Sequence, residues 1–119
     1  MTRWEFNLDT GALKEERLDD VPTEFPRMND TYLSSPSRYG YHPRIAPEPT
    51  LLFDGFIKYD LEKDEHQSHS WGPDCVGGET VFVPREGGED EDDGWVVTFV
   101  TDRRGNQSFL DIVDARHPG

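Results

Sequence analysis

The fold class is decided by a stretch in the middle of the chain, residues 53–71, which reads FDGFIKYDLEKDEHQSHSW. Ile57, Tyr59 and Leu61 alternate with Lys58 and Asp60, and this period of two is typical of a β-strand. Residues 62–65 are all charged and predict a turn, after which residues 66–71 can return as an antiparallel partner. The stretch therefore predicts a β-hairpin.

The same pattern of short strands and turns continues to both ends of the chain. Trp4, Phe6 and Leu8 alternate with polar residues before a turn at Asp9-Thr10-Gly11. Further strands are predicted over residues 12–18, 37–42, 79–84, 95–101 and 108–113, and residues 51–54 belong to the same extended stretch as residues 55–61. Residues 95–101 are almost continuously apolar, which predicts an inner strand covered on both faces. We expect an all-β fold of antiparallel meander sheets, with a loop-rich middle over residues 31–50.

Composition limits the domain organisation and the partners. A chain of 119 residues forms at most one small domain. The net charge of -13 argues against nucleic acid as a partner, because the phosphates would be repelled. The single Cys75 excludes an internal disulfide and suits a reducing compartment. No apolar stretch approaches the ~20 residues of a transmembrane helix, and we expect no signal peptide and a cytoplasmic location.

Two short motifs each place a glutamate directly before residues that predict a buried strand. Glu24 belongs to TEFPR at residues 23–27, and Glu79 belongs to GGETVFV at residues 77–83. A buried ionised carboxylate is costly unless a cation or strong donor meets it, so the pair predicts a shared polar centre. The alternative is that each glutamate caps a turn or pairs with an arginine such as Arg27. Pro26 has no amide hydrogen, which predicts a strand end or bulge here.

Together with three further motifs, in the same order, these two resemble the C-terminal part of the carotenoid cleavage oxygenases, the family of the retinal pigment epithelial membrane protein and the apocarotenoid oxygenases. The further motifs are Arg38-Tyr39-Gly40-Tyr41, residues 53–61 and Glu91-Asp92-Asp93-Gly94-Trp95. The resemblance covers residues 3–116 and implies roughly the last two blades of a seven-bladed β-propeller, with residues 1–119 as one partial domain. It also implies, for the intact enzyme, cleavage of a carotenoid or apocarotenoid double bond by O2 at a non-haem Fe(II).

The resemblance assigns Glu24 and Glu79 to the surroundings of the iron, where they accept hydrogen bonds from the outer ring nitrogens of iron-bound histidines. Such a carboxylate fixes the orientation of an imidazole and raises its basicity. The four histidine ligands of the family have no counterpart here, since three are expected before Met1 and one after residue 113 in a His-Gly segment. His117 precedes a proline instead and is expected to be an exposed tail residue. We assign no catalytic residue and expect no tightly bound iron and no activity of this chain alone.

Two other apparent metal sites are rejected. His66 and His69 lie near Cys75, but strand positions three apart face opposite sides, so a zinc site is not expected and the histidines should be solvated. Residues 89–94, EDEDDG, resemble a calcium loop, but aligning Gly94 with the invariant glycine places Val100 where a glutamate is required. This run is then expected to be a solvated connector.

Two alternatives to a truncated enzyme remain open. A two-blade piece has unpaired strand edges and apolar faces, so it could be a non-catalytic β-module that binds a partner or itself. It could also be one half of a split oxygenase that pairs with a separately encoded N-terminal part.

Overall fold

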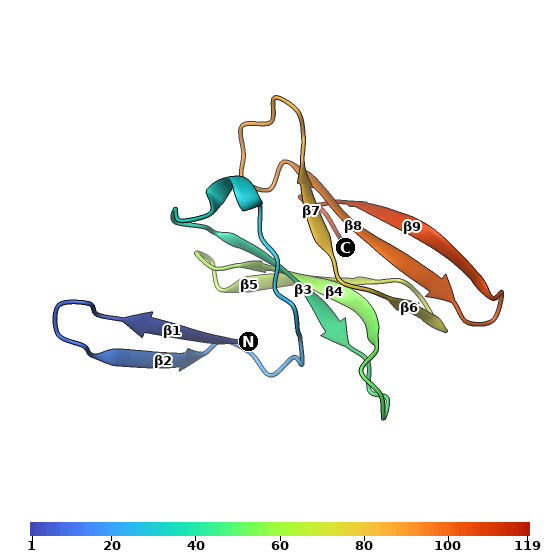
Figure 1. Cartoon of the computed structure of the whole chain (residues 1–119), viewed down its shortest axis with the longest axis horizontal. Coiled ribbons are helices and arrows are strands. Elements are labelled where there is room, and N and C mark those ends of the chain that lie inside the picture. The colour runs from blue at the N-terminus through green and yellow to red at the C-terminus, as the bar shows by residue number, and fades with distance from the viewer.

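The computed structural model describes residues 1–119 and is almost entirely antiparallel β-structure (Figure 1). The elements are β1 (Thr2–Phe6), β2 (Leu13–Arg17), the short 3-10 helix η1 (Asp30–Tyr32), β3 (Tyr39–Ile45), β4 (Phe53–Asp60), β5 (Glu65–Ser70), β6 (Cys75–Gly77), β7 (Val81–Pro84), β8 (Gly94–Asp102) and β9 (Gln107–Asp114). The all-β prediction is confirmed. No helix has the length and apolar character that crossing a membrane requires.

The strands form two blade-like units. In the first blade, β4 pairs with β3 on one side and β5 on the other, and an inner segment, residues 23–27, bridges to β3 at Thr23–Arg44 and Arg27–Tyr41. In the second blade, β6 and β7 lie end to end along β8, and β9 pairs along the full length of β8. Phe53 of β4 and Gly77 of β6 are the one pair that joins the blades in a common sheet.

The hydrophobic core lies between the two blades. Tyr41 and Phe56 come from the first blade, and Phe82 and Val96 come from the second; all four are buried. The rings of Tyr41 and Phe82 stack with their centroids 5.2 Å apart. Because full burial of each large apolar side chain contributes about 1.5–3 kcal/mol, this contact fixes how the blades pack.

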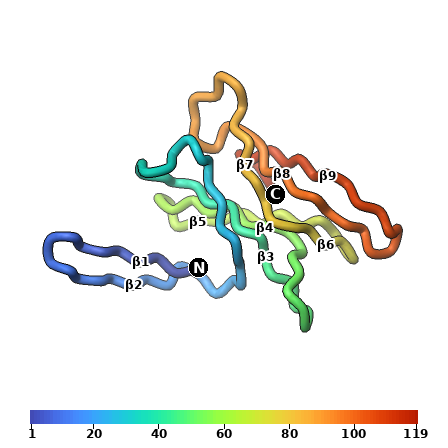
Figure 2. The backbone as a smooth tube through the Cα atoms, in the orientation of Figure 1, coloured from blue at the N-terminus to red at the C-terminus, as the bar shows by residue number.

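The hairpin β1–β2 extends away from this core (Figure 2). Gly11 has φ 71° and lies in the turn that the sequence predicts. Trp4 and Phe6 are 61% and 65% exposed, and Leu13 lies directly opposite Phe6 on the same face. The other face carries the ion pair of Arg3 and Glu16. The hairpin is therefore amphipathic, and its apolar face is uncovered in this chain.

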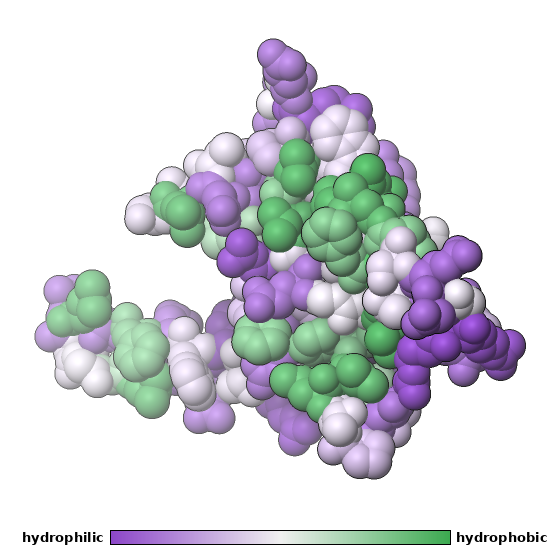
Figure 3. Space-filling view, turned by 45° about the vertical axis from the view of Figure 1, so that its right-hand side comes forward, coloured by the Kyte–Doolittle hydropathy of each residue, from purple (hydrophilic) through white to green (hydrophobic).

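The second blade also leaves an apolar face uncovered (Figure 3). Val96 and Val100 of β8 are buried, but Phe99 between them is 73% exposed and has Leu110 of β9 as its exposed neighbour. The prediction that residues 95–101 are covered on both faces is thus wrong for this chain. The alternation of a strand buries one face against the first blade and turns the other outward.

Residues 31–50 contain more strand than the sequence predicts. β3 continues through Pro43 to Ile45, and Pro43 is buried opposite Phe56. β6 has no counterpart among the predicted strands, because three residues after a Gly-Pro turn give no periodic pattern. The remaining predicted strands are confirmed with boundaries that differ by a few residues.

Candidate functional site

Glu24 lies in a one-residue β-bulge of the inner segment. Between its two bridges, the inner segment advances four positions, from Thr23 to Arg27, while β3 advances three, from Arg44 to Tyr41. The Glu24 amide still donates to the carbonyl of Pro43 at 3.1 Å. Such a bulge adds one residue, bends the strand and redirects its side chains.

Glu79 lies in a bulge with the same count in the second blade. Its segment advances four positions from Gly77 to Val81, while β8 advances three, from Val100 to Val97. The hydroxyl of Thr98 donates to the Glu79 carbonyl at 2.9 Å, which holds the bulge to β8. Both glutamates therefore occupy the same kind of irregular position on the segment that comes first in their blade along the chain.

The two bulges are neighbours through Phe53. The Phe25 ring, next to Glu24, contacts the Phe53 ring edge-on with centroids 5.9 Å apart. Phe53 in turn pairs with Gly77, where the second bulge begins. Phe25 has φ 50°, a conformation that side chains rarely adopt, so the surrounding contacts must hold it there. The structure thus brings the two motifs together, as a shared centre requires.

The predicted burial of the two carboxylates is wrong in this chain. Glu24 and Glu79 are both exposed, and neither forms an ion pair. The alternative pairing of Glu24 with Arg27 is not seen either. The flanking residues pair with the sheet, but the bulges free the glutamates from its alternation and leave their side chains in solvent.

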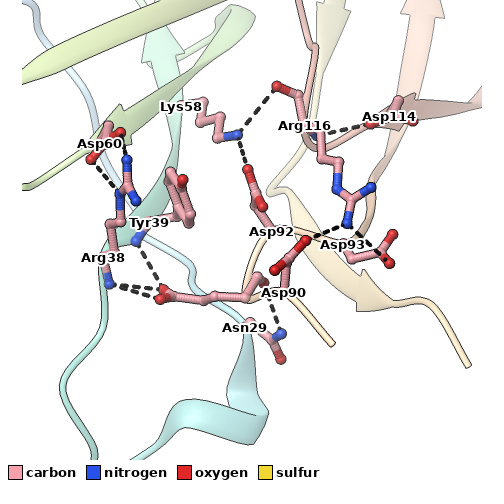
Figure 4. A network of polar contacts seen from close by, with 11 residues as sticks. Asn29, Arg38, Tyr39, Lys58, Asp60, Asp90, Asp92, Asp93, Asp114 and Arg116 are labelled. Carbon is pink, nitrogen blue, oxygen red and sulfur yellow. Dashed lines mark hydrogen bonds and ion pairs between the residues drawn. The ribbon is translucent and has the colours of Figure 1, made fainter. Parts of the chain in front are cut away.

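The acidic run is a structural connection and not a solvated connector, which corrects the sequence prediction. We call residues 85–93, between β7 and β8, the acidic loop. The Glu91 carboxylate accepts hydrogen bonds from the backbone amides of Arg38 and Tyr39 at 2.9 and 2.8 Å. The ammonium of the buried Lys58 lies 2.6 Å from Asp92. Both contacts cross from the second blade to the first (Figure 4).

Two further ion pairs, Arg38 with Asp60 and Arg116 with Asp90, surround this connection. The guanidinium of Arg38 donates to both oxygens of Asp60 at 2.8 and 2.6 Å, and these bonds lower the pKa of Asp60 to about 2. Arg116 donates to Asp90 at 2.7 Å, and its carbonyl accepts from Lys58 at 3.3 Å. The charges of this region are thus mostly satisfied within the protein, as partly buried charges must be.

The histidines do not form a metal centre. His66 is exposed, as expected, and so is His117, although the adjacent Pro118 is buried. His69 is not solvated as predicted: its Nδ1 lies 2.6 Å from the Pro118 carbonyl and its Nε2 3.3 Å from Asp111. His42 lies against the Tyr59 ring, and burial lowers its pKa to about 4. No group of three or more His, Cys, Asp or Glu side chains could hold a metal ion, so the residues of this chain do not fit an iron site.

Comparison with known proteins gives this geometry its context. All of residues 1–119 match the family described as retinal pigment epithelial membrane protein. The chain belongs to this family. Within it, the chain is 32% identical to carotenoid 9,10(9',10')-cleavage dioxygenase 1 of Pisum sativum, over 93% of this chain and 23% of the relative. It is 33% identical to the apocarotenoid-15,15'-oxygenase of Synechocystis, over 95% of this chain and 24% of the relative.

Solved structures of the family confirm the fold. A tryptophan-to-alanine variant and a cobalt-substituted form of the Synechocystis apocarotenoid oxygenase both superimpose with TM-score 0.89 and 28% identity, covering 98% of this chain and 25% of theirs. The two blades thus have the same fold as about a quarter of these apocarotenoid oxygenase chains. The chain spans about a quarter of the length of the relatives it matches.

The sequence patterns did not identify the residues that connect the two blades, Phe53 and Glu91. Phe53 and Glu91 belong to recognisable motifs, but a motif does not say which segments will meet. Glu91 carries one usable signal, because it lies three residues after the glycine pair Gly87-Gly88 and three residues before β8 begins, so its loop cannot extend far from the sheet.

Proposed function

We propose that this chain is the part of a carotenoid or apocarotenoid cleavage dioxygenase that supplies Glu24 and Glu79 as outer supports of a non-haem iron. In the complete propeller, each carboxylate accepts a hydrogen bond from the outer ring nitrogen of an iron-bound histidine. Those histidines belong to parts of the fold outside residues 1–119. Bound iron would supply the reaction with O2, and this chain would orient the ligands.

One observation carries the proposal: the two glutamates are unpaired, exposed and placed in matching bulges that meet at Phe53. Bulges frequently lie next to active sites, where they redirect a side chain. An unpaired carboxylate in such a place contributes nothing evident to this chain, so a partner from outside it is the simplest role. The relatives named above are dioxygenases and oxygenases of carotenoids and apocarotenoids, which supports the substrate class.

The test is metal analysis combined with apocarotenoid turnover. The purified chain alone should hold no stoichiometric iron and cleave nothing, whereas the chain with the remaining propeller, fused or added as a separate polypeptide, should bind iron and cleave its substrate. One tightly bound iron per isolated chain would overturn the proposal.

Substitutions then test whether Glu24 and Glu79 differ from other exposed glutamates in their effect on iron affinity and activity. In the active assembly, Glu24→Gln and Glu79→Gln should each lower iron affinity or activity about 10–100-fold. Glu86→Gln, an exposed glutamate of the acidic loop, is the matched control and should change neither. If all three variants had the same iron affinity and activity, Glu24 and Glu79 would have no role at the iron.

A second candidate function follows from the uncovered apolar face of the second blade. Val81, Val83, Phe99, Leu110 and Ile112 are each at least 40% exposed. Contiguous apolar surface of this kind marks an interface. A non-catalytic module would use this face to bind a copy of itself, and light scattering of the purified chain would then show a dimer that Phe99→Asp makes monomeric. A monomer at all concentrations contradicts this candidate.

A further inference from the structure

We propose that Glu91 is a positioning residue that sets the distance between the two glutamate-bearing bulges. It does so by fastening the acidic loop of the second blade to the first blade, at the end of the interface opposite Phe53. Its importance for chemistry rests on the proposed function, since the distance matters only if the two carboxylates support one metal.

The first contact holds the start of β3. The Glu91 carboxylate accepts from the Arg38 amide, the Tyr39 amide and the Ser37 hydroxyl at distances of 2.8 to 3.1 Å. Hydrogen bonds to an ionised acceptor are about twice as strong as neutral ones. Two consecutive amides and a hydroxyl that converge on one carboxylate also fix its orientation, so this end of β3 has one position relative to the loop.

The second contact reaches the segment that carries Glu24. Asn29 follows the inner segment and is buried, and its side-chain amide donates to the Glu91 carbonyl at 2.9 Å. Its side-chain oxygen accepts from the amide and the hydroxyl of Thr31 at 3.1 and 2.7 Å, which caps η1. Figure 4 shows Asn29 directed from η1 towards the acidic loop. Both functional ends of the Asn29 amide are thus engaged, and the inner segment is tied directly to Glu91.

The other side of the connection leads to Glu79. The acidic loop is the continuation of β7, and β7 begins two residues after Glu79. Phe82 of β7 stacks on Tyr41, and Tyr41 pairs with Arg27 of the inner segment. The inner segment of the first blade and residues 77–83 of the second blade are therefore connected at three levels. These are Phe53 with Gly77 beside the bulges, Tyr41 with Phe82 in the core, and Glu91 with Asn29 and the start of β3 at the far end. Truncation of the Glu91 side chain leaves the first two levels and the bond of Asn29 to the Glu91 carbonyl in place, and it releases the start of β3 from the carboxylate.

A distance measurement separates positioning from simple stabilisation. With Cys75→Ser as background, Glu24→Cys and Glu79→Cys introduce two spin labels, and pulsed dipolar spectroscopy gives the distribution of the distance between them. The parent should show one narrow distribution. Glu91→Ala should shift or broaden it while circular dichroism shows that the chain remains folded.

Amide exchange provides the local readout. In Glu91→Ala, the amides of Arg38 and Tyr39 should exchange roughly tenfold faster or more, because each loses a charge-assisted hydrogen bond. Glu89→Gln, an exposed glutamate of the same loop with no polar contact, is the control for charge and should leave both distance and exchange unchanged. Should Glu91→Ala fail to fold, Asn29→Ala removes the direct tie to the inner segment, keeps the carboxylate and should broaden the distance.

An unchanged distance distribution in a folded Glu91→Ala chain would overturn the positioning role. The role is equally overturned if Glu91→Ala does not fold and Asn29→Ala leaves the distribution unchanged. Because no metal takes part in these measurements, their outcome is independent of the iron analysis. If the iron analysis contradicts the proposed function, the result of the distance measurement still stands. If the distance distribution contradicts the positioning role, the proposed function of Glu24 and Glu79 still stands.

Discussion

Phe53 on β4 pairs with Gly77 on β6, and this one pair joins the two blades beside both glutamate-bearing bulges. The indole of Trp71 lies against Gly77, where a Cβ atom would come within 2.4 Å of its ring. A side chain at residue 77 would therefore have to displace the tryptophan. The close approach explains why the second bulge begins at a glycine.

Gly77→Ala should destabilise the chain by about 1–3 kcal/mol, the usual cost of overpacking a fitted site. Gly78→Ala is a matched control, since its Cβ would meet nothing closer than the Phe99 carbonyl at 4.0 Å. Denaturant unfolding followed by tryptophan fluorescence measures both the stability and the environment of Trp71. Equal stability of the two variants would contradict the close contact.

Glu24→Gln and Glu79→Gln should each change the free energy of unfolding of the chain by less than about 0.5 kcal/mol, as expected for exposed groups without partners. If either glutamate capped a turn or paired with Arg27, its replacement would cost measurably more. Chemical denaturation of the two variants beside the parent decides between these roles. A loss of about 1 kcal/mol or more would favour the structural alternative.

Asp92→Asn should cost on the order of 3 kcal/mol, because it leaves the ammonium of the buried Lys58 without its counter-charge. Lys58→Met should cost less, since Asp92 lies closer to solvent and a methionine fills the same volume. The double variant should resemble Lys58→Met alone, and this non-additivity can be measured in a double-mutant cycle. Additive losses would mean that the two groups do not interact.

Features of the fold and of the candidate site that depend on neighbouring residues could be predicted from the sequence, whereas those that depend on contacts between distant residues could not. Alternation of Ile57, Tyr59 and Leu61 and the turn at Gly11 are local signals, and the strands that they predict are confirmed. The bulges are visible only as a register difference between two segments, and no local pattern reports such a difference. The prediction for the acidic run is wrong because charge composition indicates solvent unless the buried partner is known, and Lys58 lies more than thirty residues away.

His42 makes the stability of the chain sensitive to mild acid. Burial lowers its pKa from 6.5 to about 4 in the folded chain, whereas in the unfolded chain it titrates near 6.5. Between these values the unfolded state binds a proton that the folded state does not, so stability rises with pH. The contribution of His42 is therefore fully present above pH 6.5 and is lost as the pH falls towards about 4.

His42→Phe keeps a ring against Tyr59 and removes the titration. Relative to the parent, this variant should lose less stability between pH 7 and pH 5, with a difference in slope that approaches about 1.4 kcal/mol per pH unit below pH 6. Urea unfolding at a series of pH values gives the two curves. Because carboxylates of the chain are common to both proteins, their effects cancel in the difference, and parallel curves would show that the imidazole of His42 is not held neutral by burial.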